Sequence, residues 1–210
     1  MFAHDRKKTN ASDKATNLEP PQVIFVLGGP GAGKGTQCDK IIAQFPEFKF
    51  FSAGDLLREE RKSGSKTAEM INDRIKNGQI VPASITVGLL VAAMKSCPKG
   101  SKFLIDGFPR NLDNITTWNE DVGDSCKVEF VLFLECNEEI MIGRILERAK
   151  TSGRNDDNME TLRKRFKTYE AETRPIIEDF EKKGMVRTVS ADRGIDVVYR
   201  DVEKLIQSVL

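Results

Sequence analysis

The sequence predicts an α/β protein built on a five-stranded parallel sheet with helices on both faces. Short apolar runs alternate along the chain with segments of helical periodicity, as in consecutive βαβ units. These runs are continuous, which is typical of strands buried on both faces. A glycine-rich turn separates the first strand from the first helix, and such a turn is a common ligand site in this fold class.

Apolar runs predict the five strands at residues 23–27, 48–51, 103–105, 128–134 and 185–189. Helices are expected at residues 35–44, 56–77, 84–95, 138–150 and 159–183, with another beginning near Leu112. The second of these should break near Ser63-Gly64-Ser65, and Pro175 should bend or divide the 159–183 stretch because proline cannot continue a helix freely. A last helix is indicated by apolar residues at helical spacing, which are Val198, Val202, Leu205, Ile206 and Val209.

Length and composition exclude several classes of protein. The 210 residues suit one domain of ordinary size, and no apolar run approaches the ~18 residues that a membrane span requires. With 33 Lys+Arg against 32 Asp+Glu, the net charge of +1 argues against nucleic-acid binding while leaving a local basic pocket open. The one histidine, His4, lies in a polar N-terminal stretch, which argues against histidine-based triads and metal sites.

The domain organisation is predicted to be simple. Residues 1–20 are expected to form a flexible tail without a secretory signal, and residues 21–210 a single domain. The four cysteines (Cys38, Cys97, Cys126 and Cys136) form no CxxC pair, so reduced thiols and a cytoplasmic location are favoured. The basic run 6–8 is too short to decide whether the protein also enters the nucleus.

The segment 28–36, Gly-Gly-Pro-Gly-Ala-Gly-Lys-Gly-Thr, predicts a phosphate-binding loop of the P-loop NTPase type. Its glycines let backbone N–H groups turn toward a phosphate, and Lys34 adds a positive charge at a helix N-terminus. The segment departs from the strict motif because Gly35 stands where Ser or Thr is expected and Thr36 follows one place later. A merely flexible turn would explain neither Lys34 nor the strand–loop–helix context.

Further polar residues follow the other predicted strands. Arg58 and Arg110 come after the second and third strands, and Arg144, Arg148, Arg154 and Arg165 follow the fourth. Taken singly, each arginine could be a solvated surface charge or part of a helical ion pair. Together they would neutralise the phosphates of two nucleotides bound end to end, and transfer between phosphates needs alignment and charge stabilisation rather than a strong base.

Five segments, in order, resemble the nucleoside monophosphate kinase (adenylate kinase) family, and most of all its eukaryotic UMP/CMP kinase branch. They are residues 28–36, 52–58, 78–82, 106–111 and 152–158. The resemblance implies phosphoryl transfer from MgATP to CMP, UMP and also dCMP, giving the diphosphate and ADP. It further implies a monomer with an acceptor-binding helical insertion at about 52–81 and a short lid at about 148–158.

The resemblance also implies roles for particular residues. ATP would be bound by Gly31, Ala32, Gly33, Lys34, Gly35, Thr36, Arg144, Arg148 and Arg193. The acceptor nucleotide would be bound by Arg58, Gln79, Ile80, Val81, Gly107, Phe108, Pro109, Arg110, Asn111, Asn114, Arg154 and Arg165. The catalytic residues would be Lys34, Arg148, Arg154 and Arg165. Asp106 would reach Mg²⁺ through its water shell, and the less favoured alternative is a cap or turn residue before Gly107.

The choice of acceptor depends on Asn114, because adenylate kinases typically carry glutamine at this position. An amide that can flip meets either O4 of uracil or the 4-amino group of cytosine. Alternatively, Asn111 or Asn114 caps the helix that begins near Leu112. Two other functions stay open, a short-lid adenylate kinase and a nucleotide-binding switch, although the switch lacks an Asn-Lys-x-Asp motif.

Overall fold

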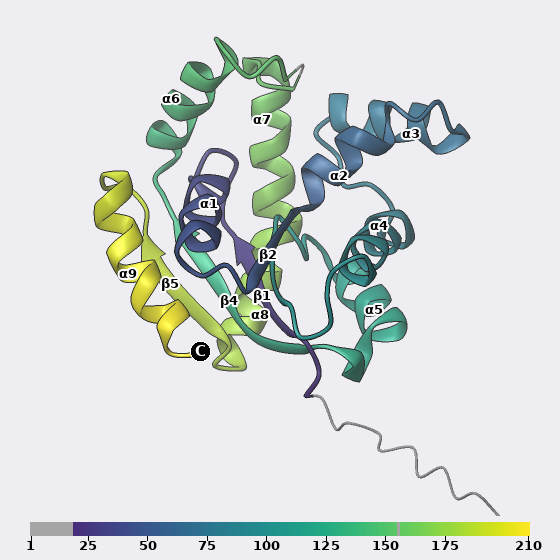
Figure 1. Cartoon of the computed structure of the whole chain (residues 1–210). Helices are drawn as coiled ribbons and strands as arrows, with labels where there is room; N and C mark the ends of the chain where they lie inside the picture. Colours follow the sequence, from purple (N-terminus) through teal and green to yellow (C-terminus); the bar gives the residue numbers. More distant parts are fainter. Residues whose placement is uncertain (1–18, 155) are drawn as a thin grey trace, which may run out of the picture.

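A computed structural model describes residues 19–154 and 156–210, and its centre is a parallel β-sheet (Figure 1). Five strands lie in the order β2-β3-β1-β4-β5. Their bounds are β1 Gln22–Leu27, β2 Phe48–Ser52, β3 Lys102–Asp106, β4 Lys127–Glu135 and β5 Val186–Ser190. Every strand pair is parallel, which confirms the predicted fold class.

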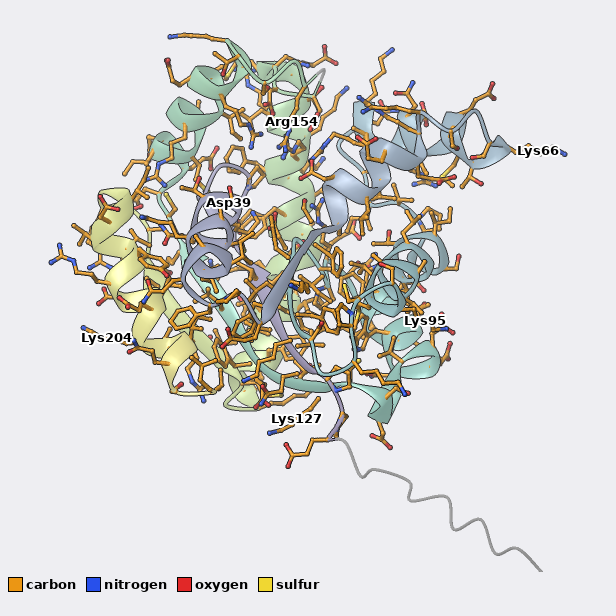
Figure 2. All side chains as sticks on the ribbon, in the orientation of Figure 1. Asp39, Lys66, Lys95, Lys127, Arg154 and Lys204 are labelled. Carbon is orange, nitrogen blue, oxygen red and sulfur yellow. The ribbon has the colours of Figure 1, made fainter. Side chains whose placement is uncertain are left out.

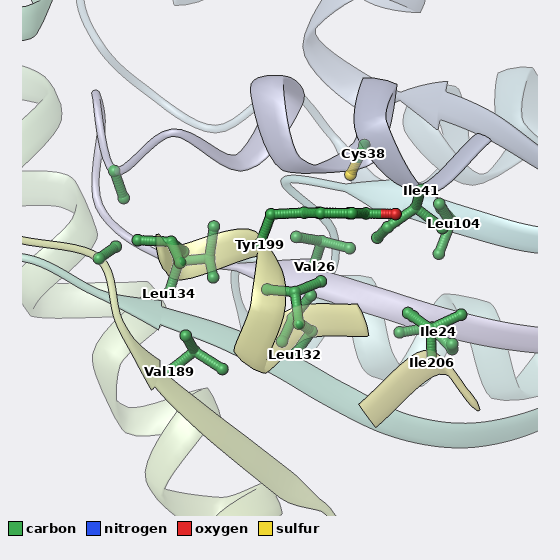
Figure 3. Close-up of a cluster of buried hydrophobic side chains, with 14 of the residues drawn as sticks. Ile24, Val26, Cys38, Ile41, Leu104, Leu132, Leu134, Val189, Tyr199 and Ile206 are labelled. Carbon is green, nitrogen blue, oxygen red and sulfur yellow. The ribbon is translucent and has the colours of Figure 1, made fainter. Parts of the chain in front are cut away.

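Helices cover both faces of the sheet. On one face lie α1 (Lys34–Gln44) and α9 (Ile195–Gln207), and on the other α4 (Ala83–Lys95), α5 (Leu112–Asp121) and α8 (Arg174–Lys182). Successive residues of β1 divide between two apolar cores, with Ile24 and Val26 in the first and Phe25 and Leu27 in the second. Figure 3 shows the first core, where Tyr199 of α9 and Ile41 of α1 pack over the strands. This burial on both faces is why the strands are continuously apolar.

Two helical segments rise above the carboxyl ends of the strands (Figure 1). One comprises α2 (Ala53–Glu60) and α3 (Lys66–Lys76), and the other α6 (Glu138–Ala149), α7 (Met159–Thr168) and the turn between them. The predicted break between α2 and α3 is confirmed, because Ser65 caps α3 by accepting the Ala68 N–H at 3.2 Å.

The long 159–183 stretch divides as expected, but the division precedes the proline. A π-helical turn, η2 (Tyr169–Thr173), separates α7 from α8, and Pro175 falls in the first turn of α8. A proline is tolerated there because the first N–H groups of a helix have no partner within the helix. The irregular turn lies near the carboxyl end of β1, since Tyr169 and Thr173 line a pocket together with Leu27 and Gly28.

Some predictions concern residues that the structure does not describe. Positions 1–18 of the tail expected at residues 1–20, His4 among them, lie outside the described residues. Asn155, within the expected lid, also lies outside them. All four cysteines are free thiols. None of the helices in the described ranges combines the length and apolarity that a membrane crossing requires.

Candidate active site

The glycine loop follows β1 and leads directly into α1. Gly31 and Gly33 adopt φ angles of 86° and 94°, a region that side-chain-bearing residues rarely enter. A Cβ on Gly31 would also approach the Met141 carbonyl oxygen to 2.5 Å. The loop therefore depends on glycine both for its turn and for its close approach to α6. It leaves the α1 N-terminus facing the cleft, where a helix favours anions.

Lys34 is folded back into this loop. Its Nζ donates hydrogen bonds to the carbonyl oxygens of Gly28 at 2.9 Å and Gly29 at 3.0 Å. Desolvation by the surrounding protein lowers the pKa of Lys34 to about 8, although the nearby Asp106 carboxylate opposes the shift. An arriving phosphate would supply the charge partner that this ammonium lacks.

One cleft of about 630 Å³ gathers the predicted cationic residues. Its lining includes Arg58, Arg110, Arg144, Arg148, Arg154, Arg165 and Arg193, together with residues 30–36 of the glycine loop. These arginines come from α2, α6, α7 and three loops that are distant in sequence. Figure 2 shows Arg154 between the α6–α7 turn and α2. The structure thus brings together the six arginines singled out from the sequence.

The lid arginines are held by a pair of buried aspartates. Arg148 forms a two-pronged bond to Asp157, with Nε–Oδ2 at 2.8 Å and Nη2–Oδ1 at 2.6 Å. Arg165 donates through Nη1 to Asp156 at 3.0 Å and to Asp157 at 3.4 Å. Burial acts to raise the pKa of Asp157, but the bond from Arg148 outweighs it and the pKa falls below its ordinary value. The carboxylates fix the guanidinium groups before any nucleotide arrives.

Asp55 connects the lid to the acceptor-binding helices. Its Oδ1 accepts from Arg58 Nη2 at 2.6 Å and from Arg154 Nη2 at 3.1 Å, across 99 residues of sequence. Burial acts to raise the pKa of Asp55, but these arginines lower it overall. Asp55, Asp156 and Asp157 were not among the site residues expected from the sequence. Asp55 stands three residues before Arg58, and this i,i+3 spacing is the signal that could have identified it.

Arg110 lines the cleft and is exposed to it. Its Nε donates to the Gly107 carbonyl oxygen at 2.7 Å, and its two terminal nitrogens have no acceptor in the described part of the chain. Desolvation lowers the pKa of Arg110, and repulsion from Arg58 adds to the shift while Asp106 opposes it. The side chain is therefore oriented by one bond and presents a free two-pronged donor.

A smaller pocket of about 70 Å³, here called the acceptor pocket, adjoins the cleft. Its lining includes Gln79, Ile80, Val81, Gly107, Arg110, Asn114 and Arg165. Four residues expected at the acceptor site do not line it, and one of them, Arg154, lines the cleft instead. Phe108 is fully buried against Phe25 and Trp118, Pro109 is buried behind it, and Asn111 bonds to Glu172 instead.

The structure also corrects the expectation that the Asn114 amide can flip. Asn114 Oδ1 accepts the Arg110 backbone N–H at 3.0 Å, which fixes the amide and leaves Nδ2 without a partner among the residues that the structure describes. Asn111 is the helix cap, since its Oδ1 accepts the Asn114 N–H at 3.0 Å. The capping alternative is therefore correct for Asn111, whereas Asn114 presents a donor.

Arg144 and Arg193 also line the cleft. Arg144 Nη2 donates to the Ala191 carbonyl oxygen at 2.8 Å, and Arg193 bonds to Ser190 and Asp201. Ile195 lies beside them in the cleft lining with 55% of its surface exposed, and Gln37 donates to its carbonyl oxygen at 3.1 Å. An exposed apolar side chain beside a planar guanidinium suits an aromatic base, and the sequence analysis did not identify Ile195.

Asp106 ends β3 beside the glycine loop. Its Oδ1 is buried without a hydrogen-bond partner among the described residues. This oxygen is therefore available as a metal ligand beside the phosphate-binding glycine loop. That chemistry fits Mg²⁺, which prefers oxygen ligands and retains much of its water. The described residues form no cluster of three or more His, Cys, Asp and Glu side chains that could hold a metal ion by themselves.

The fold and this loop between β1 and α1 define an α/β protein of the P-loop NTPase type. A family model described as adenylate kinase matches residues 26–185. The chain is 50% identical to the UMP-CMP kinase of Danio rerio over 192 residues, which is 89% of this chain and 97% of that protein. It is 52% identical to the UMP-CMP kinase of Gallus gallus over 192 residues, 89% of this chain and 96% of that protein. It is 48% identical to the uridylate kinase of Saccharomyces cerevisiae over 202 residues, 95% of this chain and 97% of that protein. The chain therefore belongs to the adenylate kinase family.

Proposed function

We propose that this nucleoside monophosphate kinase transfers the γ-phosphoryl group of MgATP to CMP or UMP, giving the diphosphate and ADP, with dCMP as a further acceptor. One observation carries the proposal: Arg58, Arg110 and Arg165 line both the cleft and the acceptor pocket. The cations thus lie where two cavities meet, as required for two nucleotides whose phosphates face each other. The names of the relatives, UMP-CMP kinase and uridylate kinase, support pyrimidine acceptors.

The chemistry follows from charge and alignment. The glycine loop and Lys34 would hold the donor phosphates at the α1 N-terminus, and Arg58 and Arg110 the acceptor phosphate. Arg148, Arg154 and Arg165 would balance the charge on the transferred group. Mg²⁺, when bound, would neutralise donor phosphate oxygens, with Asp106 holding part of its water shell. The acceptor is an ionised phosphate, so no side chain has to remove a proton.

Residues 21–210 would form the single domain that carries out this reaction. The acceptor-binding region is about 52–81 and the lid about 148–158, and their joint closure would exclude water from the γ-phosphate. A monomer remains the expectation from the family resemblance and a cytoplasmic location the expectation from the cysteine pattern, with nuclear entry left open.

A coupled ADP-release assay with MgATP tests the proposal when CMP, UMP, dCMP and AMP are offered separately. Rapid turnover with CMP and UMP and slow turnover with AMP is expected. If AMP is the best acceptor, the protein is a short-lid adenylate kinase. If no acceptor stimulates ADP release, a nucleotide-binding switch becomes the better description.

A further inference from the structure

Two buried polar atoms, on side chains that line the acceptor pocket, have no hydrogen-bond partner among the described residues. They are Asn114 Nδ2 and Asp156 Oδ1, and both side chains line the pocket. Asn114 is 2% exposed and Asp156 5% exposed, so bulk water does not reach either side chain freely. Buried polar groups are normally paired, so each atom indicates a missing partner.

The chemistry of these two atoms is fixed by their other bonds. Asn114 Oδ1 is occupied by the Arg110 N–H, so Nδ2 can only donate into the pocket. Asp156 Oδ2 is occupied by Arg165 Nη1 at 3.0 Å in an ion pair, so Oδ1 can only accept. The occupant must therefore bring an acceptor for Asn114 and a donor for Asp156.

The phosphate of the acceptor nucleotide cannot supply that donor. A phosphate dianion only accepts hydrogen bonds, and the free Arg110 nitrogens already offer it donors. The nucleoside part must then satisfy Asp156. Cytosine carries a 4-amino donor beside the N3 acceptor, whereas uracil carries the O4 acceptor beside an N3–H donor.

We propose that Asp156 is a specificity-determining residue, which accepts a hydrogen bond from the 4-amino group of cytosine while Asn114 donates to N3. This inference rests on the proposed function and extends it to a preference for CMP over UMP. A carboxylate cannot become a donor, so it repels O4 when uracil occupies the same position. Uracil satisfies both side chains only if it shifts in the pocket, which leaves UMP as the poorer acceptor.

The test compares kcat/KM for CMP and UMP at saturating MgATP in the unmodified enzyme and in Asp156→Asn. In the variant, the amide oxygen should stay on Arg165 and the NH₂ group should face the base, which favours O4. We expect a higher kcat/KM for CMP in the unmodified enzyme, and a shift of the CMP/UMP ratio toward UMP by about ten-fold in the variant. A preference for UMP in the unmodified enzyme, or an unchanged ratio in the variant, would overturn the inference.

Asp157→Asn is the matched control. It removes the same charge from the neighbouring position, but Asp157 bonds chiefly to Arg148, with a longer contact of 3.4 Å to Arg165, and does not line the acceptor pocket. We expect it to change turnover with both acceptors in the same proportion and to leave the CMP/UMP ratio where it was. A shift equal to that of Asp156→Asn would assign the effect to lid charge and refute base reading by Asp156.

A second test uses only the unmodified enzyme, so its result does not depend on whether a variant folds. The unmodified enzyme is offered the 2-pyrimidinone nucleoside monophosphate, which keeps N3 and lacks the 4-amino group. We expect kcat/KM about ten-fold below that for CMP, and equal values would refute the inference. Measurement with dCMP tests whether Asp156 contacts the sugar instead of the base. If Asp156→Asn lowers kcat/KM equally for CMP and UMP but not for dCMP, Asp156 faces the 2′-hydroxyl and the inference fails. If neither CMP nor UMP is phosphorylated by the unmodified enzyme, the proposed function itself fails.

Discussion

Replacing Arg110 with methionine should abolish most acceptor-dependent transfer while leaving the fold and ATP binding in place. The change keeps an unbranched side chain of similar length and removes the guanidinium. Arg110 is open to the cleft, and its terminal nitrogens lack acceptors in the described part of the chain, so the folded protein loses only the Nε bond to Gly107. Removing the guanidinium relieves its desolvation, which outweighs its attraction to Asp106, so we expect the melting temperature to stay constant or rise.

The magnitude follows from the two free nitrogens. Each charge-assisted hydrogen bond contributes about 1.5–3 kcal/mol, so the pair would contribute about 3–6 kcal/mol to binding the acceptor phosphate in the transition state. At about 1.4 kcal/mol for each factor of ten, kcat/KM for CMP should fall by about 10²–10⁴-fold.

The assay is coupled ADP release over a range of CMP concentrations, with ATP affinity measured separately by calorimetry. Arg163→Met, on the exposed side of α7, is the control and should leave both quantities unchanged. A loss of kcat/KM below ten-fold would refute the placement of the acceptor phosphate, and so would an equal loss of ATP affinity.

Three further changes test other parts of the site. Asn114→Gln should lose the bond to the Arg110 N–H and lower the CMP/AMP ratio of kcat/KM about ten-fold, and an unmoved ratio would show that base reading lies elsewhere. MgATP binding at pH 8 should take up about half a proton, because the pKa of Lys34 is about 8 in the free protein and bound phosphate raises it. ATP affinity should accordingly weaken above pH 8. Calorimetry in buffers of different ionisation enthalpy measures the proton uptake on MgATP binding, and Lys34→Met should show none. Gly78→Ala should destabilise the protein by about 1–3 kcal/mol in denaturant unfolding, because Gly78 has a φ of 64° and a Cβ there would lie 2.9 Å from Lys164 Cβ. Gly143→Ala, in open space on α6, should stabilise by up to about 1 kcal/mol, and the same sign at both positions would contradict the steric argument.

Much of the fold is predictable from local patterns. The run 23–27 is apolar at every position, and the structure places it as β1 at the centre of the sheet with a helical layer on each face. The glycine loop is equally local, because its conformation depends on residues without a Cβ at fixed positions and on the helix that follows. The break at 63–65 followed from a Ser-Gly-Ser turn, which the Ser65 cap explains.

The site itself was only partly accessible to such reasoning. The sequence singled out the arginines by type and by their place after the strands, but not their partners. Asp55 and Arg154 lie 99 residues apart, and nothing local indicates that one oxygen would serve both Arg154 and Arg58. Phe108 was expected at the acceptor site, yet its ring is buried in the second core. Periodicity does not tell which face a loop residue presents.

The sequence by itself determined the parallel α/β fold, the phosphate loop and the inventory of cleft cations, since these depend on residue type and short-range spacing. Only the tertiary structure decided which groups stay unpaired. The hydrogen-bond direction of Asn114 is set by the Arg110 backbone, and the free oxygen of Asp156 is left over after Arg165 takes the other. Such assignments depend on which atoms folding places at hydrogen-bond distance, about 3 Å, and in a suitable orientation.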